Sequence, residues 1–203
     1  MKRSFLGQRW HYRSDTKSPD GLARELGINP LTAKLLAARG IDTREAAVAF
    51  LDPGLHRLLE PTALAGVERA ATRIAQSIVD QEPIGVYGDY DVDGQTGTAL
   101  LVRVIRELGG KPIPYIPNRI DEGYGLNIPA MKSLVERGSK AIVTVDCGLS
   151  SIDEARWAKD HGIDLVVTDH HQPPPHLTDA YAIVDPALDL KYPGGPLAGC
   201  GVA

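Results

Sequence analysis

The sequence predicts an α/β protein with a doubly wound, mainly parallel five-stranded sheet flanked by helices and preceded by a small helical N-terminal lead-in. From residue 67 onward, apolar runs of strand length alternate with stretches of helical periodicity. Strict alternation of strand and helix is typical of parallel strands joined by crossover helices. Before that point the pattern is one of short helices. We therefore expect a lead-in over residues 1–62 and a main domain over residues 63–203.

The lead-in carries two helix-start signals. Asn29 precedes a proline and an apolar stretch, which predicts a capped helix over Leu31–Ala38. Asp42, with Glu45 three residues later, predicts a second capped helix that includes Ala46–Leu51. A pair of short helices fits either a helix-turn-helix unit or a segment that packs against the main domain, and the sequence leaves both open.

The main domain begins with an amphipathic helix over Val67–Val79 and then alternates between strands and helices. We expect the strands at Ile84–Tyr87, Ile113–Ile116, Ala141–Val145, Leu165–Thr168 and Ala182–Val184. We expect the helices between them at Thr96–Leu108, Pro129–Arg137 and Ile152–His161. In such a sheet the ligand site lies outside the carboxyl ends of the strands, so the loops that follow the strands are the place to look for function.

Composition limits the classes of function. The 203 residues carry a formal net charge of -4, so a bound polyanion would be met by a local patch or by metal ions rather than by overall charge. No apolar stretch of about 18 residues occurs, and no signal-peptide pattern opens the chain. Cys147 and Cys200 are the two cysteines, too few for a disulfide framework, which indicates a reducing cytoplasm.

Polar side chains follow each of the first four expected strands. They are Asp89, Asp91 and Asp93 after the first, Asn118, Arg119 and Glu122 after the second, Asp146 after the third, and Asp169, His170 and His171 after the fourth. Carboxylates crowded at one edge raise one another's pKa unless a cation neutralises them, so their convergence predicts bound metal. Helix capping is the alternative, by Asp93 or Thr96 for one helix and by Asp146 or Ser150 for another.

The residue types indicate which metal would bind. Oxygen ligands favour Mg²⁺ or Mn²⁺, and one imidazole among them favours Mn²⁺. The carboxylates outnumber the needs of one ion, so we expect two ions about 3.5–4 Å apart that share a bridging aspartate. Asp146 is the expected bridge because it follows a central strand, between the aspartate cluster and the histidines. Such a pair activates water and stabilises the attacking and leaving oxygens at phosphorus, which predicts phosphoester hydrolysis.

Other chemistries lack their motifs. No Gly-rich phosphate loop or dinucleotide-binding turn follows the first strand, so ATP or NAD binding has no local support. No nucleophile elbow is present, and Cys147 has no obvious basic activator beside it. Metal-assisted hydrolysis therefore leads the candidate functions.

Five segments resemble the DHH phosphoesterase superfamily and, within it, the RecJ family of bacterial single-strand-specific exonucleases. They are VYGDYDVDGQTGTALL at 86–101, PNRIDEGYGLN at 117–127, VTVDCGLSS at 143–151, VVTDHHQPP at 166–174 and VDPALDLKYPGGPLAGCGVA at 184–203. DHH and D-x-D alone indicate the superfamily. The combination of DYDVDG, NRIDEGYGLN and YPGGPLAGCGVA is typical of the RecJ family, and the lead-in is similar to that family's helical start.

The resemblance implies roles for the residues at the strand ends. It implies metal ligation by five side chains, namely Asp89, Asp91, Asp93, Asp146 and His170. His171 would face the scissile phosphate, and Asp169 would support the ligands from behind. Together with the bridging Asp146, these two residues make up the implied catalytic group.

The resemblance also implies contacts to nucleic acid from Arg119, Tyr124 and Asn127. From the residues alone, Arg119 fits equally well in a surface ion pair with Asp121 or Glu122. Tyr124 lies between two glycines, which predicts an exposed ring suited to stacking on a base.

The activity implied by the resemblance is metal-dependent 5′-to-3′ hydrolysis of single-stranded DNA to mononucleotides, in repair and recombination. A single-strand-binding protein and a helicase are the expected partners, and no membrane is involved. In the family the chain continues past the position of Ala203 with a further ligating aspartate and a second domain, so we expect an amino-terminal fragment. Two alternatives stay open: a small-substrate phosphoesterase acting on pyrophosphate, oligoribonucleotides or cyclic dinucleotides, and a replication scaffold with a decayed metal site.

Overall fold

The computed structural model describes residue 7, residues 20–52 and residues 54–203. The chain forms two compact units, Met1–Leu58 and Leu59–Ala203. The division falls after residue 58 rather than after residue 62, where the sequence pattern placed it. None of the helices in the described part of the chain combines the length and the apolarity that crossing a bilayer requires.

In its described residues the first unit contains α1 (Asp20–Leu26), α2 (Pro30–Ala37), α3 (Arg44–Leu51) and the 3₁₀ turn η1 (Leu55–Arg57). A small apolar cluster holds the three helices together, with Leu22, Leu36 and Ala47 at its centre. The predicted cap of α2 is confirmed, because Asn29 Oδ1 accepts the N–H of Leu31 at 2.9 Å. The predicted cap of α3 is wrong: the Thr43 hydroxyl, directly before the first helical residue, accepts the N–H of Ala46 at 3.2 Å.

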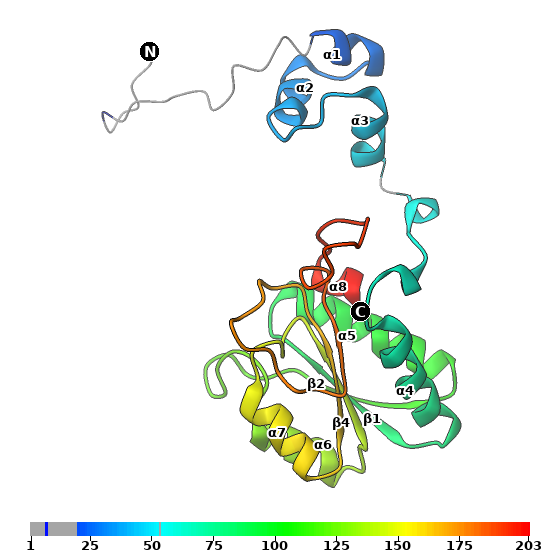
Figure 1. Ribbon diagram of the computed structural model, residues 1–203, viewed down its shortest axis with the longest axis vertical. Coiled ribbons are helices and arrows are strands. Elements are labelled where there is room, and N and C mark those ends of the chain that lie inside the picture. Colours follow the sequence, from blue (N-terminus) through cyan, green and yellow to red (C-terminus); the bar gives the residue numbers. More distant parts are fainter. Residues whose placement is uncertain (1–6, 8–19, 53) are drawn as a thin grey trace. The chain divides into compact units, whose positions relative to one another are not determined.

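The second unit contains the predicted parallel five-stranded sheet, in the order β2-β1-β3-β4-β5 (Figure 1). The strands are β1 (Pro83–Gly88), β2 (Lys111–Tyr115), β3 (Ala141–Val145), β4 (Asp164–Thr168) and β5 (Ala182–Val184). Because every strand runs the same way, all five carboxyl ends open onto one edge of the sheet.

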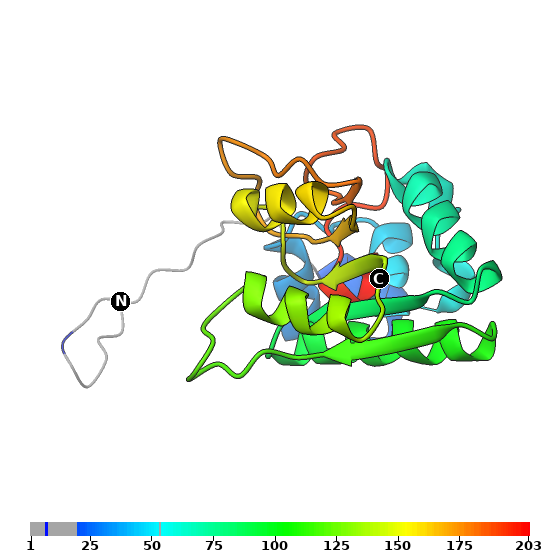
Figure 2. The ribbon, with the colours of Figure 1, turned by 90° about the horizontal axis from the view of Figure 1, so that it is seen from below.

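Helices cover both faces of this sheet. They are α4 (Val67–Val79), α5 (Val92–Glu107), α6 (Ile128–Glu136) and α7 (Ile152–Asp160), with the short η2 (Pro61–Ala63) and α8 (Gly199–Val202) at the two ends of the unit. Side chains alternate along β1, so Ile84 and Val86 pack with α4 and α5, whereas Tyr87 packs with α6 and α7. Figure 2 shows α7 in yellow and α4 in teal on opposite sides of the strands.

The second strand begins two residues earlier than predicted and ends one residue earlier, because two prolines obscured it. Pro112 and Pro114 lie inside β2, whereas the sequence pattern placed the strand at Ile113–Ile116. β2 is an edge strand paired only with β1. A proline at an edge loses no ladder hydrogen bond when its nitrogen faces away from the neighbouring strand.

The helix after β1 also begins earlier than predicted, at Val92 rather than Thr96. Asp91 caps it, since its Oδ1 accepts the N–H of Asp93 at 2.9 Å and of Gly94 at 3.1 Å. Asp93 and Thr96, the capping candidates from the sequence, lie inside the helix. One aspartate of the DYDVDG segment therefore starts α5.

Candidate metal centre

Three buried aspartates stand at the carboxyl ends of neighbouring strands. Asp89 follows β1, Asp146 follows β3 and Asp169 follows β4, and each is 2% exposed. Backbone hydrogen bonds extend the ladder one step past the strands, from Asp89 N–H to the carbonyl of Val145 and from Asp146 N–H to that of Thr168. The sheet itself therefore fixes where these carboxylates lie.

Two groups of donor atoms meet at this edge. The carboxylate oxygens of Asp89, Asp91 and Asp146 lie within 4.8 Å of one another, and so do one oxygen of Asp146 and one ring nitrogen each of His170 and His171. Asp146 belongs to both groups. The structure thus brings together four of the five residues expected to bind metal, with His171 added.

Asp146 is held in an unusual conformation and lacks a full set of partners. Its φ is +63°, in the left-handed region that few residues other than glycine adopt. Its Oδ1 lies 2.9 Å from His170 Nε2 without the geometry of a hydrogen bond, so that buried oxygen has no hydrogen-bond partner. Burial, followed by the negative charges of Asp91 and Asp93, raises the pKa of Asp146 to about 6, although His170 opposes this.

Asp89, like Asp146, has a carboxylate oxygen without a hydrogen-bond partner. This oxygen is the buried Oδ1, and burial raises the pKa of the carboxyl. The start of α5 closes over it: a Cβ at Gly94 would lie 2.5 Å from the backbone N and O of Asp89. Two buried carboxylate oxygens without donors, close to an imidazole, match the oxygen and nitrogen ligands that Mn²⁺ and Mg²⁺ accept. The residues present therefore fit a divalent cation.

Asp93 points to α8 rather than into either donor group. Its Oδ2 accepts the N–H of Gly199 at 2.7 Å and its Oδ1 accepts the N–H of Cys200 at 2.8 Å. Burial acts to raise the pKa of Asp93, but these two backbone donors, Cys200 foremost, leave it below its ordinary value. Oδ2 also lies 3.5 Å from His170 Nε2. Metal ligation by Asp93 stays a prediction, and the structure adds an anchoring role that the sequence did not show.

The contact between α8 and the centre is close. A Cβ on Gly199 would lie 2.9 Å from Asp146 Cβ and 3.0 Å from its Oδ1. Only a glycine leaves room for that carboxylate. Gly199 and Cys200 therefore form one wall of the site.

Asp169 supports both histidines. Its Oδ1 accepts the N–H of His170 at 2.8 Å and lies 2.7 Å from His171 Nδ1, while its Oδ2 accepts the N–H of Leu149 at 3.0 Å. Hydrogen bonding to a carboxylate places the ring proton on Nδ1 and leaves His171 Nε2 as the acceptor. Burial lowers the pKa of His171, but the carboxylates around it, Asp169 first, raise it overall. Asp169 therefore holds both histidines by hydrogen bonds, and the ligand-supporting role that the resemblance implied stays a prediction.

The expected nucleic-acid residues lie on the loop between β2 and α6, residues 116–127, which contains no helix or strand. The guanidinium carbon of Arg119 lies 5.0 Å from the ring centroid of Tyr90. The alternative ion pair with Asp121 or Glu122 is not found among the described residues. Glu122 instead accepts the Tyr115 hydroxyl at 2.5 Å and the N–H of Asn118 at 2.8 Å.

Tyr124 and Asn127 have different surroundings. Tyr124 is 58% exposed, as the flanking glycines predicted, and its ring meets those of Tyr90 and His171 edge to face. Asn127 caps α6, because its Oδ1 accepts the N–H of Ala130 at 2.8 Å and its Nδ2 donates to the Tyr87 hydroxyl at 3.1 Å. The proline at residue 129 signals this cap, much as the proline at residue 30 signals that of α2. The structure therefore shows a structural role for Asn127, and substrate contact remains a prediction.

Sequence reasoning missed two side chains at this edge. Asp185 follows β5, is buried, and has an Oδ2 without a hydrogen-bond partner. The pattern of an acid after a strand could have found it, because it recurs at the fifth strand. Tyr90, between Asp89 and Asp91, contacts both Arg119 and Tyr124, and no local pattern indicates those contacts.

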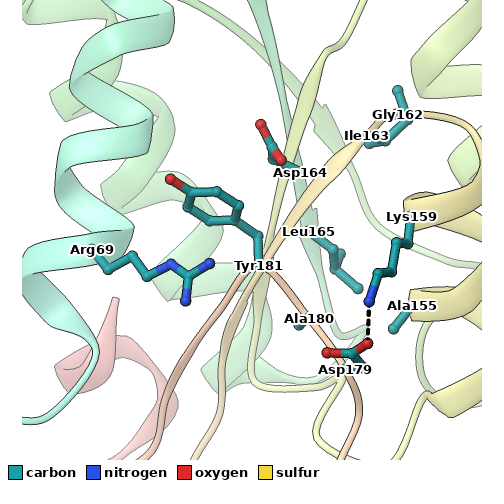
Figure 3. Close-up of a pocket in the computed structure, with 10 residues that line it drawn as sticks. All are labelled: Arg69, Ala155, Lys159, Gly162, Ile163, Asp164, Leu165, Asp179, Ala180 and Tyr181. Atoms are coloured by element: carbon teal, nitrogen blue, oxygen red, sulfur yellow. Dashed lines mark hydrogen bonds and ion pairs between the residues drawn. The ribbon is translucent and has the colours of Figure 1, made fainter.

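Two cavities distinguish the edges of the sheet. One of about 140 Å³ lies at the carboxyl edge, lined by Tyr124, Leu149, Ser150, His171 and Gln172 among others. The larger, of about 310 Å³, lies where β4 and β5 begin (Figure 3). Its charged side chains are engaged within the protein: Lys159 pairs with Asp179 and Arg69 lies over the ring of Tyr181. The smaller cavity is the one that adjoins the candidate metal centre.

Comparisons with known proteins agree with this geometry. Residues 83–203 match the family model described as "DHH family, N-terminal domain". Over 197 residues the chain is 44% identical to the single-stranded-DNA-specific exonuclease RecJ of Bacillus subtilis (strain 168), a match that covers 96% of this chain and 25% of that protein. The chain therefore spans about a quarter of the length of this curated relative.

Two crystal structures of RecJ from Thermus thermophilus are also similar. The complex with Mn²⁺ gives a TM-score of 0.69 at 31% identity, covering 91% of this chain and 25% of the solved chain. The complex with Mg²⁺ gives a TM-score of 0.54 at 29% identity, covering 91% of this chain and 21% of the solved chain. With the family model matched along the whole sheet and across the acidic edge, this chain belongs to the DHH family.

Proposed function

We propose that this chain carries the catalytic centre of a metal-dependent 5′-to-3′ exonuclease that hydrolyses single-stranded DNA to mononucleotides. The observation that carries the proposal is Asp146, a buried carboxylate without a hydrogen-bond donor at Oδ1, shared by an all-aspartate group and an aspartate–histidine group of donor atoms. Burying such a charge is unfavourable unless a cation meets it. The relatives named single-stranded-DNA-specific exonuclease support the substrate class.

We further propose that the centre takes two divalent ions, Mn²⁺ or Mg²⁺. The pair of donor groups that share Asp146 supports two positions rather than one. When bound, the ions would supply positive charge that activates water and offsets charge at phosphorus. Asp89 and Asp91 would hold one position and His170 the other, with Asp146 between them.

The remaining side chains would handle the substrate. His171, whose Nδ1 is hydrogen-bonded to Asp169, would offer Nε2 to the substrate as a hydrogen-bonding and proton-accepting group. Arg119 would pair with a backbone phosphate, and Tyr124 would stack on a base at the rim of the 140 Å³ cavity. Because the chain's formal net charge is -4, these local contacts and the ions carry the attraction for DNA.

Repair and recombination are the setting that we infer. A single-strand-binding protein and a helicase, which together expose and deliver single strands, are the proposed partners. The proposed location is the cytoplasm, where bacterial DNA is found. The two partners follow from the single-stranded substrate, and a binding experiment with each of them tests this.

The test uses a protein that contains this chain, a 5′-labelled single-stranded oligonucleotide and a 3′-labelled copy. With Mn²⁺ we expect labelled mononucleotide from the 5′ label at once and from the 3′ label only at the end. EDTA and Asp146→Ala should both abolish release, and circular dichroism should give the wild-type spectrum for the variant. Release from both labels at the same rate would contradict the polarity, and full activity of the variant would contradict the metal centre.

Two comparisons separate the alternatives. Unlabelled pyrophosphate, a short oligoribonucleotide or a cyclic dinucleotide competes strongly only if one of them is the preferred substrate. Manganese bound per chain, measured by elemental analysis after dialysis, separates an enzyme from a scaffold. A metal-free, inactive protein would favour the scaffold.

A further inference from the structure

Tyr90 lies at the point where the acidic edge meets the 116–127 loop. It stands between Asp89 and Asp91, two of the candidate ligands, and its side chain is half-buried. The Gln95 side chain donates to its backbone carbonyl at 2.5 Å, which ties this position to the first turn of α5. The backbone of Tyr90 is therefore fixed by the same elements that fix the donor atoms.

The ring of Tyr90 contacts two of the three residues expected to bind the substrate. The Arg119 guanidinium carbon lies 5.0 Å from its centroid, within the range of a cation–π contact. The Tyr124 ring meets it at a centroid distance of 6.3 Å and an angle of 77°. On its other side Tyr124 meets His171 at 6.2 Å and 80°. A continuous series of ring contacts thus runs from Arg119 to the candidate catalytic imidazole.

The 116–127 loop gives these two side chains little other support. Gly123 and Gly125 flank Tyr124 with φ values of +79° and +85°, so the backbone there has wide conformational freedom. The guanidinium of Arg119 makes no hydrogen bond or ion pair with the described residues. Its position therefore depends on the face of the Tyr90 ring.

We propose that Tyr90 is a positioning residue that holds Arg119 and Tyr124 in the geometry that binds the terminal nucleotide of single-stranded DNA. It does so through the face and edge of its ring, not through its hydroxyl. The inference rests on the proposed function for the identity of the ligand. Prior ordering of two binding side chains lowers the entropy lost when DNA binds, so removing the ring weakens affinity before it slows chemistry.

The structure offers a matched control. Arg69 lies 4.4 Å from the centroid of Tyr181, the same kind of pair at the opposite edge of the same sheet, beside the cavity of Figure 3. Tyr181→Ala and Arg69→Ala remove an equivalent contact where no DNA is expected. They should leave DNA affinity unchanged.

The experiment measures binding without catalysis. A fluorescent single-stranded oligonucleotide is titrated in EDTA with the wild type, Tyr90→Ala, Arg119→Ala and the double variant, and the Kd values form a double-mutant cycle. We expect Tyr90→Ala to raise Kd about fivefold. The increase in Kd of the double variant should be about threefold smaller than the product of the two single increases, which is the size of an ordinary cation–π contact. Additive effects in the cycle would overturn the proposal.

Conservative variants test the ring itself. Tyr90→Phe should restore Kd to within about twofold of the wild type, whereas Tyr90→Leu, which keeps bulk without an aromatic face, should resemble Tyr90→Ala. Under Mn²⁺, Tyr90→Ala should raise KM for DNA more than it lowers kcat. If Leu restores binding as well as Phe, or if only kcat changes, Tyr90 does not position the substrate residues.

The failures of the two proposals are distinguishable. A wild type that binds no single-stranded DNA and releases no nucleotide contradicts the proposed function. A wild type that does both, with Tyr90 variants that bind as it does, contradicts only the positioning role.

Discussion

The acidic side chains at the two edges of the β-sheet have opposite surroundings. At the edge where β4 begins, Asp164 is met by Arg73 at 2.5 Å, and the same guanidinium reaches Glu82 and Ser77. At the edge where the strands end, oxygens of Asp89, Asp146 and Asp185 are buried without donors. At the first edge a guanidinium neutralises the acids, whereas at the second edge three carboxylate oxygens have no hydrogen-bond partner. The difference favours the second edge as the candidate site for a cation, because a positive ion would satisfy the carboxylate oxygens that lack hydrogen-bond donors.

The largest effect is expected from Asp146→Asn, which keeps the shape of the side chain but removes its charge. Nuclease activity should fall by about a thousandfold, because the shared ligand of both donor groups is lost. Without metal the variant should unfold at a higher temperature than the wild type, and Mn²⁺ should stabilise only the wild type. Thermal unfolding with and without Mn²⁺ checks this. A variant that Mn²⁺ still stabilises to the full extent would mean that Asp146 is not a ligand.

At the opposite edge, Arg73→Met should lower the stability of the protein, whereas Asp146→Asn should raise that of the metal-free protein. The Arg73 side chain is 12% exposed, and its loss strands Asp164 and Glu82, which are partly open to water. We expect the free energy of unfolding to fall by about 2 kcal/mol, between the values for surface and buried pairs. Urea denaturation measures this free energy. The value for Arg73→Lys, which keeps the charge, should lie between those of the wild type and Arg73→Met. No change in either variant would mean that solvent already screens this network.

The pH dependence of the metal-free protein sharpens the contrast. Burial raises the pKa of Asp146 to about 6, above about 3.9 for an unfolded chain. Between these values the folded state holds a proton that the unfolded state releases. The protonated Asp146 carboxyl therefore contributes its full stabilisation below about pH 4, and about 3 kcal/mol of it is lost as the pH rises through about 6.

Urea denaturation at several pH values in EDTA tests this, with Asp146→Asn as the control. The slope between about pH 4 and pH 6 should be smaller in the variant. Identical slopes would show that other carboxylates, such as Asp89 or Asp185, account for the titration.

The smallest effect is expected from Lys159→Ala at the amino edge. Lys159 and Asp179 form an ion pair at 2.5 Å, but their side chains are 68% and 80% exposed. Exposed pairs are screened by water and salt. The unfolding temperature should stay within experimental error of the wild type at physiological ionic strength. A clear decrease would show that the cavity of Figure 3 relies on this pair for its shape.

Much of this arrangement follows from local sequence signals. Apolar runs of strand length predict the five strands, and polar residues after them predict the acidic edge, because parallel strands end together. The roles within the DYDVDG segment were not predictable in the same way. Asp91 and Asp93 look alike locally, and what separates them is the pair of amide donors at Gly199 and Cys200, which lie 106 and 107 positions from Asp93 in the chain.

The same limit applies to the contacts of aromatic and basic side chains. Tyr90 meets Arg119 and Tyr124 only because the loop between β2 and α6 folds back over the loop after β1. Arg73 meets Asp164 across 91 positions of sequence. Periodicity reports which face of an element is buried, whereas these pairs depend on how separate elements are placed in space.

The prolines of β2 bear on whether the open edge of the sheet can pair with another strand. In a parallel strand, alternate residues direct their backbone groups to opposite sides, so Pro112 and Pro114 share the outward side. Neither carries an N–H, and the outer edge of β2 offers no donor at these two positions. A strand from another molecule cannot complete a regular ladder there, which protects the sheet against edge-to-edge polymerisation. The prolines that displaced the predicted bounds of this strand are thus the ones that leave its outer edge without regular hydrogen-bond donors.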